Sequence, residues 1–237
     1  MPRSTVALLF IMAGKIRLKQ IEDCVGRCGT VADIGCDHGY LCADLLQSGK
    51  IKHAIAVDIS AGSLQKAREL AAAMQLSEME CRQGNGLAPL AENEADYIVI
   101  AGMGGLLIKE ILTADLKKAQ RAKLVLSPHT HAGEIRRFLH ENAFRIDREE
   151  LVYEDKKYYQ IICASAGTMS VENEFDYDFG VKLHQQSTTV YQEFLQCKLA
   201  QAKRVRKGLL IGTDVDAELQ NNARVIAELE RRIRKCR

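Results

Sequence analysis

The chain of 237 residues contains no tryptophan, few other aromatic residues (5%) and only three prolines. No apolar run approaches the roughly 20 residues of a membrane-spanning helix, so we expect no membrane segment. The net charge is only +2, so any nucleic-acid binding must depend on local basic patches rather than on a global excess. Hydrophobic residues make up 47% of the chain, which is enough for a sizeable core.

Metal-binding and disulfide patterns are also lacking. Eight cysteines are present, but none form a C-x-x-C pair, and no group of Cys and His has zinc-finger spacing. We therefore expect no metal site. Cys36, Cys42 and Cys163 lie within apolar runs, which is typical of buried free thiols in a reducing cytosol. The sequence thus favours a cytoplasmic location.

The first residues contain an apolar run, Val6–Ala13, after a single basic residue, Arg3. The thin basic region and the lack of an A-x-A site argue against a signal peptide. Met12 opens the sequence MAGKIRLKQIEDCV, which reads as a natural start. We expect Met12 to be the initiator and the first eleven residues to be an annotation artefact or a loose tail, and we set residues 1–14 apart from the catalytic domain as a loose tail or a mis-annotated start. The mass of the native protein would decide this.

Short apolar runs alternate with helical patterns from residue 14 to residue 142, which predicts a parallel α/β sheet. The predicted strands are 30–35, 54–59, 80–83, 96–101 and 123–127, and the predicted helices are 14–26, 40–46, 61–74, 106–112 and 133–142. The stretch 144–164 predicts two further strands joined by a turn at 154–157, which add an antiparallel hairpin.

The C-terminal part has a different pattern. Residues 166–185 have no clear period and indicate a connector. From about His184, apolar residues step by three or four in two stripes separated at 208–213, which predicts an antiparallel, coiled-coil-like helical hairpin. We therefore expect a catalytic domain at 15–166, and a connector with a helical domain at 167–237.

The segment between Phe194 and Thr213 holds five basic residues and no acid. The five are Lys198, Lys203, Arg204, Arg206 and Lys207. They are either a solvated helix face or a patch that binds a phosphate backbone.

The most informative motif is VADIGCDHGYL at residues 31–41, an apolar strand that ends in a glycine turn and leads into a helix. This element commonly cradles a cofactor, because glycine lets the backbone approach a ligand. The dinucleotide pattern G-x-G-x-x-G is not met, since Asp37 replaces its middle glycine. A carboxylate there would repel a pyrophosphate by roughly 4 kcal/mol at an effective dielectric near 20. The ammonium and sulfonium of S-adenosylmethionine would suit it better. An ordinary strand–turn–helix without a ligand is the alternative.

Polar residues or glycines lie at or just beyond the ends of three further predicted strands. Asp58 ends the second strand, where an acid can hydrogen-bond a ribose. Asn85 follows the third strand and could accept a hydrogen bond from an adenine amino group. The run 101–105 (AGMGG) gives a bare backbone after the fourth strand, where the reacting group would lie. Ligands bind outside the carboxyl ends of such strands, so these features together predict one site.

These motifs resemble the bacterial tRNA (adenine-N1)-methyltransferases that modify position 22, a class I S-adenosylmethionine-dependent family. The similarity is carried by 33–41, 56–60, 82–87 and 100–105, with further agreement at 17–21 and 127–132. It implies a Rossmann-like class I methyltransferase sheet with an antiparallel terminal hairpin, and a C-terminal helical hairpin that binds tRNA. It also implies S-adenosylmethionine as cofactor and N1 of adenine 22 as the methylated atom. We expect a monomer.

Site residues follow from the resemblance, position by position. The implied cofactor-binding residues are Asp33, Gly35, Cys36, Asp37, Gly39, Asp58, Ile59, Gly84, Asn85, Gly86, Ala101, Gly102, Met103 and Gly104. The candidate RNA-binding residues are Arg17, in the segment that resembles the family's N-terminal helix, and the five basic residues of the C-terminal segment, Lys198, Lys203, Arg204, Arg206 and Lys207, where the hairpin matches the family in architecture only.

Asp37 and His38 are the catalytic candidates. Adenine N1 already has a free lone pair, so catalysis is largely positioning and electrostatics, and a carboxylate could stabilise the developing cation. Asp37 could instead hold only the ammonium of the cofactor. His38 could orient Asp37 or be a structural residue of the turn.

Three places differ from the family pattern. Asn85 stands where aspartate is usual, Cys36 where serine is frequent, and 127–129 (SPH) where Gln-Pro-Asn is frequent.

The alternative functions are a methyltransferase acting on another RNA base, a small molecule or a protein, and a non-catalytic RNA-binding module of the same fold. A nicotinamide dehydrogenase is disfavoured by Asp37.

Overall fold

The computed structural model describes residues 16–185, 188–211 and 215–236. The predictions for residues 1–14 and for Met12 lie outside these residues. The chain divides into two compact units, with the boundary between Ser170 and Val171.

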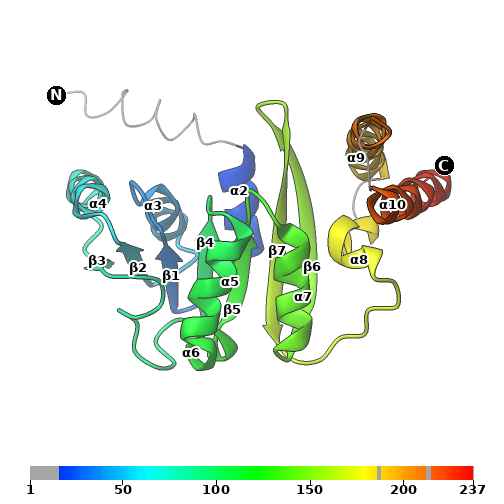
Figure 1. The fold of residues 1–237 in the computed structure, drawn as a ribbon. Coiled ribbons are helices and arrows are strands. Elements are labelled where there is room, and N and C mark those ends of the chain that lie inside the picture. The colour runs from blue at the N-terminus through cyan, green and yellow to red at the C-terminus, as the bar shows by residue number, and fades with distance from the viewer. Residues whose placement is uncertain (1–15, 186–187, 212–214, 237) are drawn as a thin grey trace. The chain divides into compact units, whose positions relative to one another are not determined.

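The first unit is built on a seven-stranded sheet in the order β3-β2-β1-β4-β5-β7-β6 (Figure 1). The strands are β1 (Thr30–Ile34), β2 (His53–Asp58), β3 (Met79–Gln83), β4 (Tyr97–Ala101), β5 (Lys123–Ser127), β6 (Phe144–Glu154) and β7 (Lys157–Ala166). Strands β1 to β5 are parallel, whereas β7 is antiparallel to both β5 and β6. The predicted parallel sheet with an antiparallel hairpin is therefore confirmed. The strand order reverses between β1 and β4, which places the switch point of the sheet at the ends of these strands.

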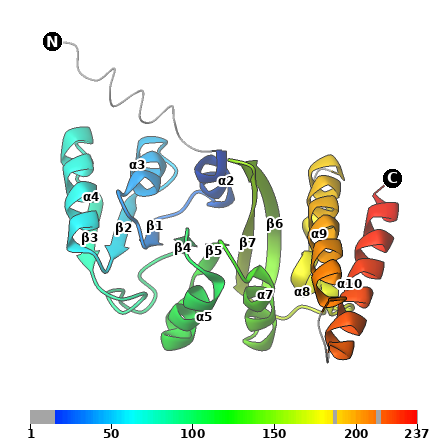
Figure 2. The same ribbon diagram turned by 45° about the horizontal axis from the view of Figure 1, so that its top comes forward.

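Helices cover both faces of the sheet. Figure 2 shows α2 (Ile16–Cys24), α3 (Tyr40–Gln47) and α4 (Ala61–Met74) on one side, and α5 (Gly105–Ala114) and α7 (Ala132–Glu141) on the other. The central strands are buried almost throughout, which explains their continuous apolar sequences.

Two short helices in the described chain are missing from the sequence prediction. These are α6 (Leu116–Arg121), of six residues, and α8 (Phe175–Phe179), of five. Such lengths cannot display a helical period. The interpretation of 166–185 as an irregular connector is wrong in this part, because α8 and a 3-10 helix, η1 (Leu183–Gln185), bury aromatic and aliphatic side chains.

The second unit contains the predicted helical hairpin, formed by α9 (Thr188–Leu209) and α10 (Asp216–Lys235). Helix α9 begins at Thr188, four residues beyond the predicted start. Asn222 Nδ2 donates to the Ala202 carbonyl at 3.1 Å, and Arg232 approaches Tyr191 from the other end of the pair, so the two helices run antiparallel. Leu195 and Leu229 are fully buried in the helical pair.

Candidate cofactor and active site

The turn after β1 requires its glycines. Gly35 and Gly39 have φ values of 76° and 75°, in the left-handed region. A Cβ on Gly35 would lie 2.1 Å from Met103 Cε, and one on Gly39 would lie 2.4 Å from Met79 Cε. A side chain at Gly35 would therefore have to displace the flexible end of Met103 and would be strained by the left-handed backbone.

Asp58, the last residue of β2, connects three loops. Its Oδ2 accepts a hydrogen bond from the Asp37 backbone N–H at 3.1 Å, and its Oδ1 accepts one from the Ser60 N–H at 2.8 Å. The Gly84 N–H donates to the Asp58 carbonyl at 3.1 Å. The neighbouring Ile59 side chain is 70% exposed and offers an apolar surface beside this acid.

Asp33 is the most unusual acid of the site. It is 6% exposed, and among the described residues no side chain or backbone group hydrogen-bonds its carboxyl group. Burial, followed by the charge of Asp58, raises the pKa of Asp33 to about 7. Because the carboxylate form is disfavoured here, a cationic ligand beside Asp33 would stabilise it. Burial also raises the pKa of the Cys36 thiol, which stays neutral.

Asp37 and His38 lie side by side on the β1 turn. The Asp37 side chain is 76% exposed, and its Oδ1 lies 3.4 Å from His38 Nε2. Lys66 Nζ, from α4, lies 3.1 Å from the same nitrogen. An ammonium group can only donate and a carboxylate can only accept, so Nε2 either accepts from Lys66 or donates to Asp37, depending on the tautomer of the ring. The sequence did not predict a role for Lys66, because it lies 28 residues from His38 and only folding brings the two side chains together.

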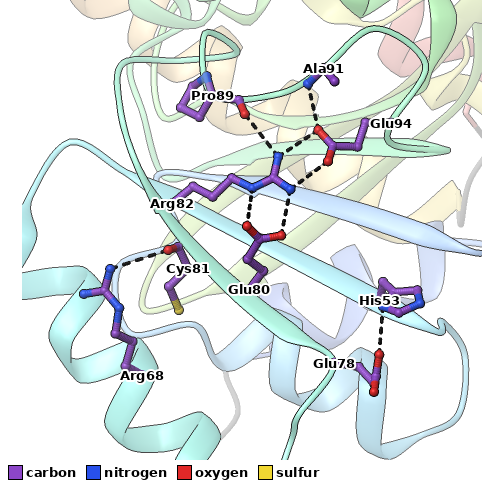
Figure 3. Close-up of polar contacts among 9 residues, drawn as sticks. All are labelled: His53, Arg68, Glu78, Glu80, Cys81, Arg82, Pro89, Ala91 and Glu94. Carbon is purple, nitrogen blue, oxygen red and sulfur yellow. Dashed lines mark hydrogen bonds and ion pairs between the residues drawn. The ribbon is translucent and has the colours of Figure 1, made fainter.

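The loop that carries Asn85 is fixed by Arg82, on β3 (Figure 3). The Arg82 guanidinium bridges two carboxylates, at 2.7 and 2.8 Å from Glu80 and at 2.7 and 2.8 Å from Glu94. It also donates to the Pro89 carbonyl at 3.1 Å. We call Arg82, Glu80 and Glu94 the β3 clamp, because together they close the loop from Gly84 to Glu94 onto the strand.

One of the two ion pairs of the β3 clamp, Arg82 with Glu80, could be predicted from the sequence. Glu80 and Arg82 are two residues apart on a strand, so their side chains lie on the same face. Glu94 comes from beyond the loop, and no sequence pattern points to it. Asn85 and Gly86 also line a small hollow of about 80 Å³ against α5.

The loops after β4 and β5 are joined by their backbones. Gly102, with φ 82°, donates to the Ser127 carbonyl at 3.2 Å, and the His129 N–H donates to the Met103 carbonyl at 2.8 Å. A Cβ on Gly102 would meet nothing within 4 Å, so this backbone faces open space. The Ser127 hydroxyl is buried and has no hydrogen-bonding partner in the described chain. The bare Ala101–Gly104 segment therefore lines the same edge as Asp33.

The predicted RNA-binding residues lie in both units. Arg17, on α2, places Nη1 at 2.6 Å from His129 Nε2. The other five lie along α9, where Lys203, Arg204 and Lys207 are exposed and Lys198 and Arg206 are half-buried. Lys203 pairs with Glu230 of α10 at 3.1 Å.

No described helix is both long and apolar enough to cross a membrane. Within residues 16–185, 188–211 and 215–236, no three His, Cys, Asp or Glu side chains gather as a metal-binding group. All eight cysteines are free thiols.

The strand order and the antiparallel last pair, with acids at the ends of β1 and β2 and a glycine-rich turn after β4, are those of the class I S-adenosylmethionine-dependent methyltransferase fold. Within that class, the family model of tRNA (adenine(22)-N(1))-methyltransferase, TrmK, matches residues 31–236. The chain belongs to this family, and the resemblance inferred from its motifs is confirmed.

Individual relatives agree with this family. A Bacillus subtilis (strain 168) tRNA (adenine(22)-N(1))-methyltransferase is 37% identical over 153 residues, and the match spans 64% of each protein. The crystal structure of the B. subtilis m1A22 tRNA methyltransferase TrmK superposes with a TM-score of 0.79 at 28% identity, covering 94% of this chain and 96% of that one. A Streptococcus pneumoniae structure in complex with S-adenosyl-L-methionine superposes with a TM-score of 0.82 at 29% identity, covering 92% and 98%.

Proposed function

We propose that this protein transfers a methyl group from S-adenosylmethionine to N1 of adenine 22 in tRNA. The observation that carries the proposal is the family match over residues 31–236, which includes both the cleft and the helical hairpin. The chemistry of this sheet edge supports it, because the carboxylates of Asp33 and Asp58 interact there and Asp37 follows on the adjoining turn, where its backbone N–H donates to Asp58.

The residues of the cleft fit this cofactor. Asp33 is buried without a partner and would gain one from a cationic group. Asp58 would accept hydrogen bonds from the ribose, Asn85 would read the adenine, and the exposed Ile59 would cover the adenine face. When bound, S-adenosylmethionine supplies an electrophilic methyl group on its sulfonium.

The protein's own contribution is positioning and charge stabilisation. Asp37 has an exposed carboxylate on the turn and would stabilise the positive charge that adenine acquires at N1. In the tautomer that carries the proton on Nε2, His38 would donate to Asp37 and fix its orientation. No general base is required, because N1 is unprotonated.

The tRNA would be held mainly by phosphate contacts. The exposed Lys203, Arg204 and Lys207 of α9 provide a basic surface for the backbone. Removing the target adenine from its stack costs a few kcal/mol, which such contacts would offset. We propose that the protein acts as a monomer in the cytoplasm, which light scattering and cell fractionation test.

Methyl transfer from labelled S-adenosylmethionine to unmodified tRNA tests the proposal. Asp37→Ala should abolish transfer while tRNA affinity is kept. Arg204→Glu should weaken tRNA binding while cofactor affinity, measured by calorimetry, is kept. If both variants bind both ligands as the wild type does, these assignments are wrong. Absence of cofactor binding by the wild type would favour a non-catalytic RNA-binding module instead.

A further inference from the structure

The β6–β7 hairpin extends beyond the carboxyl edge of the sheet. Strand β5 ends at Ser127, where Leu126 is level with Ile162 of β7. Strands β6 and β7 continue as a pair beyond that point, up to Glu154 opposite Lys157. Figure 1 shows the hairpin rising past the ends of its neighbours. Residues 153–159, here called the hairpin tip, therefore lie at the edge that carries the cleft.

The hairpin tip combines aromatic rings with cations. Tyr153 is 51% exposed, and its ring centroid lies 4.8 Å from that of Tyr158. Lys156 and Lys157 are exposed at the turn, beside the exposed Asp155 and the half-buried Glu154, so the two acids balance the two lysines and Arg17 supplies the excess positive charge. Aromatic faces next to flexible cations are the elements with which proteins hold single-stranded nucleic acid.

The base of the hairpin tip reaches the loop after β4. The Tyr159 ring lies 4.8 Å from Arg17 Cζ and 5.7 Å from the His129 ring. Arg17 donates to His129, whose backbone N–H is bonded to the Met103 carbonyl. The Arg17 Nε atom is buried and has no hydrogen-bonding partner in the described chain. Arg17 is thus placed next to the Met103 loop by its contacts with His129 and Tyr159.

We propose that the hairpin tip, with Arg17 at its base, is an RNA-binding surface of the catalytic unit that holds the nucleotides flanking the target adenine. Tyr153 and Tyr158 stack on unpaired bases, and Arg17, Lys156 and Lys157 contact their phosphates. Duplex RNA offers no free base faces, so this surface acts on nucleotides that have left their stack. The inference rests on the proposed function, and it adds a second contact region to the basic helix α9.

Affinity for labelled, unmodified tRNA, measured by fluorescence anisotropy with the full chain, tests the hairpin tip. We expect Tyr153→Ala and the pair Lys156→Glu with Lys157→Glu each to weaken binding about 10-fold. Tyr153→Phe keeps the ring and should bind within about twofold of wild type. Lys52→Glu, an exposed charge change at the opposite edge of the sheet, is the matched control and should have no effect.

Cofactor affinity and circular dichroism establish that each variant is folded with an intact cleft. Wild-type affinity in the Tyr153→Ala variant and in the double lysine variant would overturn the proposal, and would leave the tip as a surface for a protein partner or for none. Methyl transfer by the wild type is scored separately. A wild type that binds tRNA through the tip but transfers no methyl group would contradict the proposed function alone.

Discussion

Asp33 shows how burial changes the chemistry of a single residue. Its pKa is raised to about 7 by burial and by Asp58, so folding favours the protonated form. That contribution to stability is fully present below the ordinary pKa near 4 and is lost as the pH rises through about 7. From pH 4 to pH 8, the stability of Asp33→Asn relative to wild type should therefore rise by up to about 4 kcal/mol. Urea denaturation at the two pH values measures this, and a constant difference would contradict the assignment.

The same titration predicts how cofactor binding depends on pH. If the ionised Asp33 pairs with the cationic cofactor, affinity for S-adenosylhomocysteine should rise about 10-fold between pH 6 and pH 8. Asp33→Asn should bind more weakly and lose this dependence. Calorimetry in buffers of different ionisation enthalpy would detect the proton released by wild type. Equal pH profiles for the two proteins would show that Asp33 does not face the cofactor.

At the scale of single residues, the sequence predicts the residues at the ends of strands. It does not predict the side chains that distant segments bring into contact with them. Asp33, Asp58 and Asn85 could be placed at one edge because each lies at or just beyond the carboxyl end of a recognisable strand. Lys66 beside His38, and Glu94 beside Arg82, could not be predicted, because those pairs form only when distant segments fold together.

At the scale of elements, the β3 clamp is the device that fixes the Asn85 loop. Arg82→Lys keeps a positive charge but cannot bridge Glu80 and Glu94 with paired hydrogen bonds. The KM for S-adenosylmethionine should rise roughly 5- to 10-fold, with kcat nearly unchanged, because the loop is loosened while the reacting edge is kept.

Arg145→Lys is the matched control for the β3 clamp. Arg145 also pairs with a carboxylate two residues away on its strand, Asp147, at 2.7 Å, but it lies on β6. It should leave both kinetic constants unchanged. A fall in kcat without a change in KM for Arg82→Lys would count against a role in positioning the loop.

Long periodic elements were the predictable ones. The helix at 61–74 and the strand at 123–127 match the structure at both ends, because the helix begins at a serine cap and the strand ends before proline. Helices α6 and α8 were missed because each is at most two turns long. The shift of register in β6 between Ile146 and Arg148 also has no sequence signature.

At the scale of the whole molecule, the basic surface of α9 should make tRNA affinity depend on salt. Replacing Lys203, Arg204 and Lys207 together by alanine should reduce the slope of log affinity against log salt by about 2. Lys203→Ala alone should have the smallest effect of the three, because Glu230 already pairs with Lys203. Binding titrations at several salt concentrations measure these slopes, with Lys52→Ala as control. Unchanged slopes would mean that α9 is a solvated face.

The central claim is tested most directly by locating the methyl group on the RNA. Unmodified tRNA is incubated with the wild-type protein and S-adenosylmethionine, and the modified nucleotide is mapped by mass spectrometry of nuclease fragments. We predict N1-methyladenosine at position 22, and no methyl transfer to a transcript that carries guanine there. Methylation at any other nucleotide, or equal methylation of the guanine transcript, would contradict the account.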